Sequence, residues 1–370
     1  MRMDAVAGSP TRELELIEAV RAGDKDAFAE IVEPLHDALL AHCYRMLGSL
    51  QDAEDALQDT LLRAWRAAAG FEGRSSVSTW LYSIATNASL TALERRRRRA
   101  LPLDYGPAAA ADEIPGDPLD DAYWLEPFPD HDAGPVTSAP EARYDARESV
   151  ELAFIAAIQH LTASQRAVLI LRDVLGFSAR ESAETLGTTT ASVTSALQRA
   201  RLVTEERLPE LSQQATLGAL GDRRLSELVT AYTDAWERED VAAVVALLSE
   251  DATFAMPPLR TWFRGRGPIA RFLEQAPLSG RWRWRALRAK ANGQEALGYY
   301  AWEDAAARWL PFALNVLTIR GESIGAVTAF LTRPAEITDR ADLQRMPELE
   351  ADPRRVSAIF DRIGLPPHLS

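Results

Sequence analysis

The sequence predicts a multidomain protein in which two all-α modules precede an α+β domain. Residues 12–100 and 148–213 place apolar side chains at helical spacing, whereas strand-like runs begin only after about residue 222. The stretch 101–147, between the helical modules, has a different composition. A chain of 370 residues is long enough for two or three domains.

The first module, residues 12–100, is expected to be helical with short breaks. Asp24 and Ser49 each stand where an N-cap is expected, just before a helical pattern. Residues 70–76, Gly-Phe-Glu-Gly-Arg-Ser-Ser, have the composition of a loop between two helices.

One predicted helix of this module carries acidic side chains at regular spacing. Asp52, Asp55 and Asp59 stand at i, i+3 and i+7 and therefore share a helical face, with Gln58 beside them and leucines on the other side. Such a face can pair with a basic partner helix. A solvated charged face explains the spacing equally well, so both interpretations stay open at this point.

The segment 71–87 combines aromatic rings with small hydroxyls and an amide. Rings can stack on an unpaired base, and hydroxyl or amide groups can read its edge. The arginine run 95–99 can contact phosphates, although a solvated helix end is the alternative. Core packing is the alternative for Trp80 and Tyr82.

Residues 101–147 are predicted to be an extended acidic linker. They hold eight prolines and eleven acidic residues against two arginines. Trp124, Leu125 and Phe128 interrupt this composition and could dock on another part of the protein.

The second helical module, residues 148–213, has the spacing of a helix-turn-helix. Ser178 and Glu181 fit a capping box, as do Thr162 and Gln165. A helix over 178–186, a break at 187–189 and a helix from about Thr190 to Glu206 complete the pattern.

Composition limits the classes of protein to consider. The net charge of −13 argues against a uniformly basic DNA-binding protein, but the acidic residues are concentrated in 101–147. Cys43 is the only cysteine, so neither an intrachain disulfide nor a cysteine zinc site can form.

Without a signal peptide or a long apolar run, the chain is expected to be cytoplasmic and not bound to a membrane. We expect no metal, no cofactor and no catalytic residues.

Two blocks of this sequence resemble the extracytoplasmic-function sigma factors of bacterial RNA polymerase. DALQDTLLRAWRAAAGFEGRSSVSTWLYSIATNASLTALERRRR is similar to their region 2, and LTASQRAVLILRDVLGFSARESAETLGTTTASVTSALQRARLV is similar to their region 4. The order of the two blocks and the linker between them also match. The resemblance implies an alternative sigma factor that binds core RNA polymerase through the β′ clamp and the β flap and directs transcription initiation at promoter DNA.

The resemblance also implies roles for individual residues. The residues matched to the β′ clamp contact are Asp52, Asp55, Gln58 and Asp59. Those matched to capture of a flipped base of the −10 element are Phe71, Ser75, Ser76, Trp80 and Asn87. Those matched to the −35 major groove are Ser195, Gln198, Arg199 and Arg201. Thr194 and Ala196 stand where many relatives have basic residues, so base preferences do not transfer from the family.

Residues 222–333 resemble a SnoaL-like domain, a cone-shaped α+β fold related to nuclear transport factor two. We expect helices at 222–238 and 240–249, followed by strands at 252–255, 282–289, 297–302, 312–320 and 324–330. Six of the nine tryptophans lie in this part, so its pocket would be rich in tryptophan. A subset of extracytoplasmic-function sigma factors carries such an extension after region 4.

Some SnoaL-like relatives are enzymes, which makes acid–base catalysis one hypothesis for this domain. Its candidate groups would be Asp251, Tyr299, Tyr300, Glu303 and Asp304. No pair has a recognisable motif spacing, and the domain has no histidine. The domain could instead sense a ligand or contact another protein.

The sequence as a whole favours a sigma factor whose C-terminal domain modulates it, through an intramolecular contact with the two sigma modules. A helix-turn-helix regulator that acts without polymerase and an enzyme built on the SnoaL-like domain are the rival functions. The tail, residues 334–370, has helical character at 354–363 and could fold back onto another module.

Overall fold

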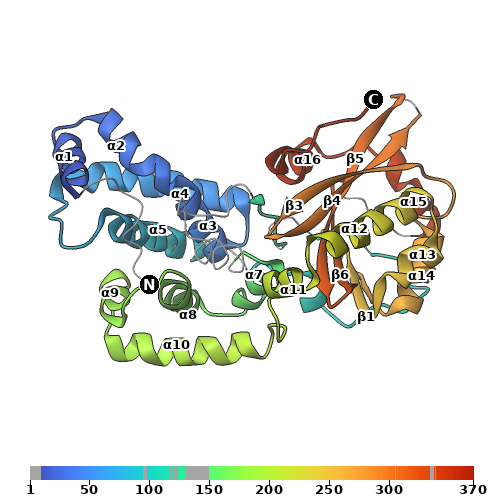
Figure 1. Ribbon diagram of the computed structural model, residues 1–370, viewed down its shortest axis with the longest axis horizontal. Helices are drawn as coiled ribbons and strands as arrows, with labels where there is room; N and C mark the ends of the chain where they lie inside the picture. The colour runs from blue at the N-terminus through green and yellow to red at the C-terminus, as the bar shows by residue number, and fades with distance from the viewer. Residues whose placement is uncertain are drawn as a thin grey trace. The chain divides into compact units, whose positions relative to one another are not determined.

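The computed structural model describes residues 10–94, 98–116, 118–119, 124–130, 150–304, 306–333, 337 and 339–370. The described residues form two compact units. The first unit comprises those up to Arg99 and those between His131 and Pro209, and the second comprises those of Ala100–Asp130 and Glu210–Ser370. The first unit is helical, and the second contains a sheet with helices around it (Figure 1).

The N-terminal part of the first unit is a bundle of helices. They are α1 (Pro10–Arg21), α2 (Lys25–Val32), α3 (His36–Leu47), α4 (Leu50–Ala67) and α5 (Val77–Leu93). The side chains of Asp24 and Ser49 cap α2 and α4, as predicted. Gly48 ends α3 in the left-handed conformation (φ 72°), which glycine adopts without strain. Leu39, Tyr44 and Leu81 are among the buried side chains at the centre of this bundle.

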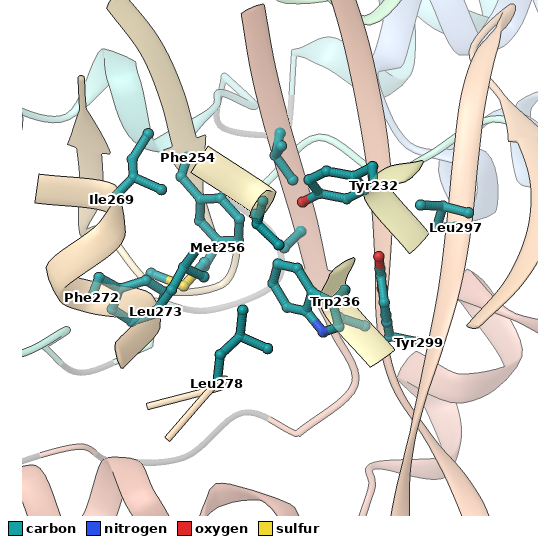
Figure 2. Close-up of a cluster of buried hydrophobic side chains, with 14 of the residues drawn as sticks. Tyr232, Trp236, Phe254, Met256, Ile269, Phe272, Leu273, Leu278, Leu297 and Tyr299 are labelled. Carbon is teal, nitrogen blue, oxygen red and sulfur yellow. The ribbon is translucent and has the colours of Figure 1, made fainter. Parts of the chain in front are cut away.

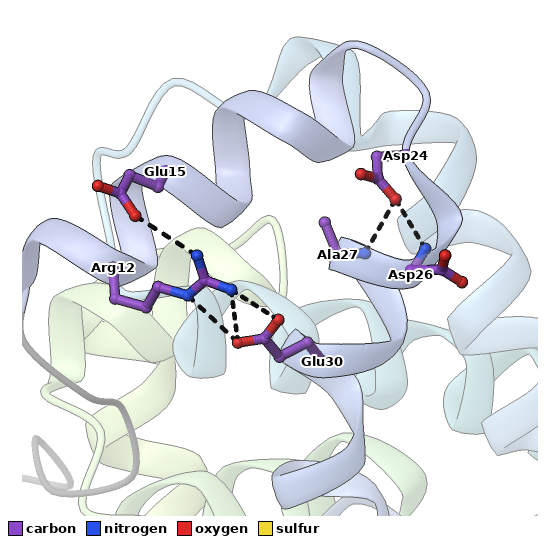
Figure 3. Close-up of polar contacts among 6 residues, drawn as sticks. All are labelled: Arg12, Glu15, Asp24, Asp26, Ala27 and Glu30. Atoms are coloured by element: carbon purple, nitrogen blue, oxygen red, sulfur yellow. Dashed lines mark hydrogen bonds and ion pairs between the residues drawn. The ribbon is translucent and has the colours of Figure 1, made fainter.

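An ion pair on the surface joins the first two helices. Arg12 on α1 contacts both carboxylate oxygens of Glu30 on α2, with the shortest distance 2.9 Å, and also reaches Glu15 (Figure 3). About half of each partner's side chain is exposed, so solvent screening leaves this pair a small contribution to stability.

The C-terminal part of the first unit is the predicted helix-turn-helix. Its helices are α7 (Leu152–Ile158), α8 (Ala163–Leu169), which continues into a π-helical turn (Ile170–Val174), α9 (Ala179–Thr185) and α10 (Thr190–Glu205). Both predicted capping boxes are present, at Thr162 and at Ser178. The helix α10 packs against α8 and α9, with Val193 and Ala200 buried in the contact.

A buried arginine ties these two parts of the first unit together. Arg166 on α8 donates hydrogen bonds to the carbonyls of Ile158 and Gln159 and to that of Met46 on α3. A buried guanidinium needs such partners, because an unsatisfied charge in the interior costs several kcal/mol. The two parts are therefore packed as one unit.

The second unit is built on a six-stranded mixed sheet with the order β2-β1-β6-β5-β4-β3. Its strands are β1 (Leu248–Ala255), β2 (Trp262–Arg264), β3 (Trp284–Ala291), β4 (Gln294–Glu303), β5 (Arg308–Arg320) and β6 (Ser323–Leu331). Only β1 and β6 pair in parallel; the other pairs are antiparallel. The strand β1 begins at Leu248, which pairs with Ile324, so the predicted helix 240–249 is wrong in its last residues.

Helices cover one face of this sheet. They are α11 (Gln213–Leu220), α12 (Asp222–Glu237), α13 (Val241–Ala246) and α14 (Arg266–Gln275). The residues that α12 buries stand at helical spacing, and they are Leu225, Leu228, Val229, Tyr232, Ala235 and Trp236. Figure 2 shows Tyr232 and Trp236 beside Phe254 and Tyr299 in the resulting core.

The C-terminal tail packs on its own unit. It contains α15 (Arg340–Arg345), a 3-10 helix (Met346–Glu348), α16 (Pro353–Ile359) and a second 3-10 helix (Asp361–Ile363). Phe360 packs edge-on against Tyr300 of β4, and Leu365 lies so close to Gly298 that a Cβ there would meet it at 2.5 Å. The helical character predicted for 354–363 is confirmed, and the tail docks on the sheet.

The described residues of 100–130 are not an extended tether but lie against the second unit. Trp124, Leu125 and Phe128 are almost completely buried. The backbone of Phe128 exchanges two hydrogen bonds with Asn292, at 3.0 and 2.8 Å. We call the described residues of 100–130 the docked segment. The rest of the predicted linker, residues 131–147, lies outside the described residues.

Candidate polymerase- and DNA-binding surfaces

The exposed side of α4 is a stripe of polar residues with a leucine at its end. Gln51, Asp55, Gln58 and Leu62 stand at i, i+4, i+7 and i+11 and are all exposed. Asp59 lies at the border of this stripe, where it forms an ion pair with Arg63 at 2.6 Å. The structure thus brings Asp55, Gln58 and Asp59 together on one surface.

Asp52 lies outside this stripe. Its side chain is only 9% exposed, and its carboxylate is paired with Arg99 at 2.8 Å. The predicted common face of Asp52 with Asp55 is therefore not an exposed one, because α4 turns Asp52 toward Arg99. The same pair removes Arg99 from the predicted phosphate-binding run, of which Arg95–Arg97 lie outside the described residues.

The loop before α5 presents hydroxyl groups beside packed aromatic rings. Ser75 and Ser76 are exposed, and Ser76 also caps α5 by accepting a hydrogen bond from the Thr79 amide at 3.2 Å. Phe71 is buried and packs on the half-buried Trp80, with ring centroids 4.9 Å apart. The hydroxyls are accessible in this conformation, whereas the ring of Phe71 is not.

Asn87, on the exposed side of α5, contacts the helix-turn-helix part of the same unit. Its side-chain amide donates to the carbonyl of Thr185 at 3.2 Å, and Ser83 shares a hydrogen bond of 2.8 Å with the Thr185 hydroxyl. The N–H group that could read a base is thus engaged by the end of α9. A base could take this group only if the contact with Thr185 opened.

The recognition helix α10 exposes one polar face. Ser195, Gln198 and Arg199 all lie on it. Thr194 is exposed as well, but Ala196 is buried, so this position faces the core of the helix-turn-helix. The amide of Gln198 and the guanidinium of Arg199 are groups suited to base edges and phosphates.

Arg201, which is also exposed, is held by an acidic partner. Its guanidinium donates two hydrogen bonds to the carboxylate of Asp173, at 2.9 and 2.7 Å. These bonds raise the pKa of Arg201 above its ordinary value. The pair links α10 to the π-helical turn that follows α8, and because the Arg201 side chain is 53% exposed, its guanidinium is also accessible from solvent.

Polar groups proposed for catalysis in the second unit are scattered. Asp251 is on the surface and pairs with Arg320 at 2.7 Å, and Asp304 accepts from Arg283 at 2.9 Å. Tyr300 donates to the carbonyl of Pro366 at 2.8 Å, on the face covered by the tail. Tyr299 points to the opposite, helix-covered face. The geometry does not assemble these groups into one acid–base site.

Two features are absent from the described residues. No helix among them is long and apolar enough to span a bilayer. No group of three or more His, Cys, Asp or Glu side chains among them is arranged to hold a metal ion.

Two exposed leucines were not part of the sequence-based site. Leu62 on α4 is 55% exposed and Leu202 on α10 is 63% exposed. Leu62 was expected on the buried side with the other leucines. Its spacing of four residues from Gln58 is the signal that places it on the exposed stripe.

Comparisons with known proteins agree with this architecture. Residues 31–99 match the family model for Sigma-70 region 2, and residues 151–202 match that for Sigma-70, region 4. Residues 229–328 match the SnoaL-like domain.

Individual relatives extend the match over most of the chain. The ECF RNA polymerase sigma factor SigG of Mycobacterium tuberculosis is 43% identical over 314 residues, covering 84% of this chain and 82% of SigG. The RNA polymerase sigma-H factor of Pseudomonas aeruginosa is 31% identical, over 54% of this chain and 96% of its own. The crystal structure of the extracytoplasmic function sigma factor SigJ of M. tuberculosis has the same fold, with a TM-score of 0.54 and 22% identity over 90% of this chain and 99% of SigJ.

The two helical parts of the first unit, the sheet of the second unit and the extent of the match to SigG lead to one assignment. The chain belongs to the extracytoplasmic-function RNA polymerase sigma factors and is an alternative sigma factor with a C-terminal SnoaL-like domain.

Proposed function

We propose that this sigma factor binds core RNA polymerase through α4 and reads its promoter through α5 and α10. The observation that carries the proposal is that the residues matched to polymerase binding and those matched to promoter reading lie on different elements of the first unit. Asp55, Gln58 and Asp59 gather on one helix, whereas the hydroxyls of the 71–76 loop and the polar face of α10 stand on others.

The polymerase contact uses the exposed stripe of α4. Its acidic groups suit a basic partner helix, and Leu62 adds an apolar contact that a purely solvated face would not offer. Asp52 supports the stripe through its pair with Arg99, and does not itself touch the β′ clamp in this arrangement.

The −10 element is read by the loop before α5 and by Asn87. Ser75 and Ser76 present hydroxyls, Phe71 and Trp80 form the aromatic floor, and Asn87 supplies the amide. Because Asn87 is bound to Thr185 in the closed first unit, promoter reading requires region 4 to move away from α5. The −35 element is read by Ser195, Gln198, Arg199 and Arg201, whose guanidinium is also paired with Asp173.

Substitutions on α4 should affect binding to core polymerase, whereas a substitution on α5 should affect promoter opening. Charge reversal at both Asp55 and Asp59 should weaken binding to core polymerase by at least about tenfold, measured without DNA. Asn87→Ala should leave that affinity unchanged and reduce promoter opening, measured by permanganate reactivity of the −10 region. Charge reversal at both Glu205 and Glu206, exposed at the end of α10, changes the net charge by the same amount and is the matched control. Loss of polymerase binding in Asn87→Ala would contradict the assignment of α5.

We further propose that the SnoaL-like domain modulates the sigma factor through the docked segment. This segment follows region 2 in the sequence and leads to region 4, and its backbone is hydrogen-bonded to the domain. The distance that can separate region 2 from region 4 therefore depends on whether this segment is docked on the domain. The regulatory role predicts that deletion of the domain from about residue 214 changes transcription from a cognate promoter.

A further inference from the structure

The core of the second unit contains a cavity with an almost entirely apolar wall. Its volume is about 40 Å³, and the wider hollow around it, part of which is open to solvent, measures about 480 Å³. Trp282 and Trp284 pack around Phe312 on one side, with ring centroids 5.4 and 5.1 Å from it. Such a wall of rings suits a flat ligand.

Two polar groups of this wall, the indole N–H of Trp236 and the hydroxyl of Tyr299, have no hydrogen-bond partner. The side-chain amide of Asn315 also lines the cavity and interacts with the hydroxyl of Tyr232. The three residues are 4%, 1% and 1% exposed. Leaving a buried donor unsatisfied costs about 1–3 kcal/mol, so two of them in one cavity call for an explanation.

Neighbouring indoles in the same wall show that the fold can satisfy such groups. The N–H of Trp282 donates to the carbonyl of Gln344 at 2.9 Å, and that of Trp284 donates to the carbonyl of Pro277 at 2.7 Å. Trp236 has no such acceptor, although its ring lies 4.8 Å from that of Tyr299. Figure 2 shows these two residues together with Met256, which also lines the cavity.

The lack of charge in the described wall and its hydrogen-bond donors indicate which kind of ligand suits the cavity. None of the described residues that line the cavity carries a charge, so an ionic ligand would be left without a counter-ion. Burial raises the pKa of the Tyr299 hydroxyl well above its ordinary value, which keeps this group neutral and able to donate. Trp236 and Tyr299 can therefore donate to an oxygen atom, and so can the second N–H of the Asn315 amide.

We propose that this cavity binds a small, uncharged, flat organic molecule whose carbonyl oxygen accepts hydrogen bonds from Trp236, Tyr299 and Asn315. The absence of a carboxylate or imidazole from the described wall makes this a binding site and not an acid–base catalytic one.

The walls of this cavity include parts of the unit that a ligand could influence. Leu343 and Met346 of the tail contribute to the wall. Met256 and Leu259 belong to the turn after β1, whose Pro258 carbonyl accepts a hydrogen bond of 3.0 Å from Leu119 of the docked segment. A bound molecule would thus contact the turn that holds this segment.

The test uses the full chain without polymerase or DNA, so its outcome is independent of sigma activity. The probes are 1-indanone and indane, which have nearly the same size and differ in the carbonyl. Tryptophan fluorescence should show saturable binding of 1-indanone, and indane should bind about tenfold more weakly, as expected for one or two lost hydrogen bonds. Amide exchange in 256–259 and 340–348 of the unaltered chain should slow on addition of 1-indanone.

Variants assign the binding to this cavity. Tyr299→Phe and Asn315→Leu should each weaken 1-indanone about three- to tenfold and leave indane unchanged. Ala329→Phe should abolish binding of both probes by filling the cavity. Tyr300→Phe, on the opposite face of the same strand, is the matched control and should bind like the unaltered chain.

Three results would overturn the proposal. They are the absence of saturable binding by either probe, binding that Ala329→Phe leaves intact, and equal affinity for the two probes with no effect of Tyr299→Phe. The last result would mean that the three donors are satisfied by water in the cavity.

Discussion

Single buried side chains set much of the chemistry of the first unit. His42 and Arg166 are both almost completely buried among the helices that carry the proposed polymerase- and DNA-binding surfaces. His42 shares a hydrogen bond of 2.9 Å with the hydroxyl of Thr86 on α5. Burial lowers the pKa of His42 to about 3 and raises that of the neighbouring Cys43 thiol to about 12. Both groups are therefore neutral at physiological pH.

The depressed pKa of His42 predicts a pH-dependent stability. The unfolded chain binds a proton at His42 near pH 6.5, whereas the folded chain does so only near pH 3. The free energy of unfolding should therefore be unaffected by His42 above pH 6.5 and fall between pH 6.5 and 3, by at most about 1.4 kcal/mol per pH unit. The difference in slope between the unaltered chain and His42→Gln, from urea unfolding at several pH values, measures this contribution. An unchanged slope in His42→Gln would contradict the assignment of the acid sensitivity to the buried imidazole.

Residue-level roles were only partly predictable from the sequence. Helical spacing correctly grouped Asp55 and Asp59, but it also placed Asp52 with them, because spacing does not show that Arg99 returns to α4 from 47 positions away. Phe71 was matched to base capture through the resemblance to region 2, and its burial depends on Trp80 and on the bundle around it. Contacts between residues far apart in the sequence depend on the tertiary structure, so a local sequence pattern does not reveal them.

At the scale of elements, the helix starts were the best-predicted features. Side chains that cap a helix act within three residues, so Asp24, Ser49, Thr162 and Ser178 could be identified from local sequence alone. The end of α13 was not predictable in this way. Leu247 and Leu248 continue a helical pattern, but pairing of Leu248 with Ile324 draws this part of the chain into the sheet.

The capping box of α9 gives a prediction for the helix-turn-helix. The Ser178 hydroxyl accepts from the amide of Glu181 at 3.1 Å, and the Glu181 carboxylate accepts from the amide of Ser178 at 2.7 Å. Ser178→Ala should destabilise α9 by about 1 kcal/mol, because an amide at the helix start loses its acceptor. Amide exchange in residues 179–186 should be faster by about fivefold.

The conservative replacement for this cap is Ser178→Asp, since aspartate caps helices as well as serine does. It should keep the exchange rates of the unaltered chain. Equal acceleration in Ser178→Asp and Ser178→Ala would show that the hydroxyl acts in some way other than as a cap.

At the scale of the whole molecule, the docked segment is the feature that the sequence predicted only in part. Eight prolines and an acidic excess over 101–147 are typical of a tether, and Trp124, Leu125 and Phe128, which are buried in the structure, were the only sign of docking. Several of the contacts are backbone hydrogen bonds, such as Ala109 to Trp262 at 2.8 Å. Backbone groups are the same in every residue, so composition cannot show where they pair.

Docking of this segment can be tested in the full-length chain. Phe128→Ser removes a side chain that is completely buried, and it should cost about 3–5 kcal/mol of the segment's contact with the second unit. Limited proteolysis should then cut within 100–130 at a protease concentration that leaves the unaltered chain intact. Leu103→Ser is the control, because Leu103 is 41% exposed. If both variants resisted proteolysis equally, the segment would be held by contacts other than Phe128.

The most direct measurement of the central claim is run-off transcription with core RNA polymerase on a genomic promoter library. It compares the full chain with a chain that ends near Leu211. The account predicts promoter-specific transcripts that require this protein, and an output that differs between the two forms because the second one lacks the SnoaL-like domain. Equal output from equal amounts of both forms would contradict a regulatory role of that domain, and no transcripts from either form would contradict the sigma factor itself.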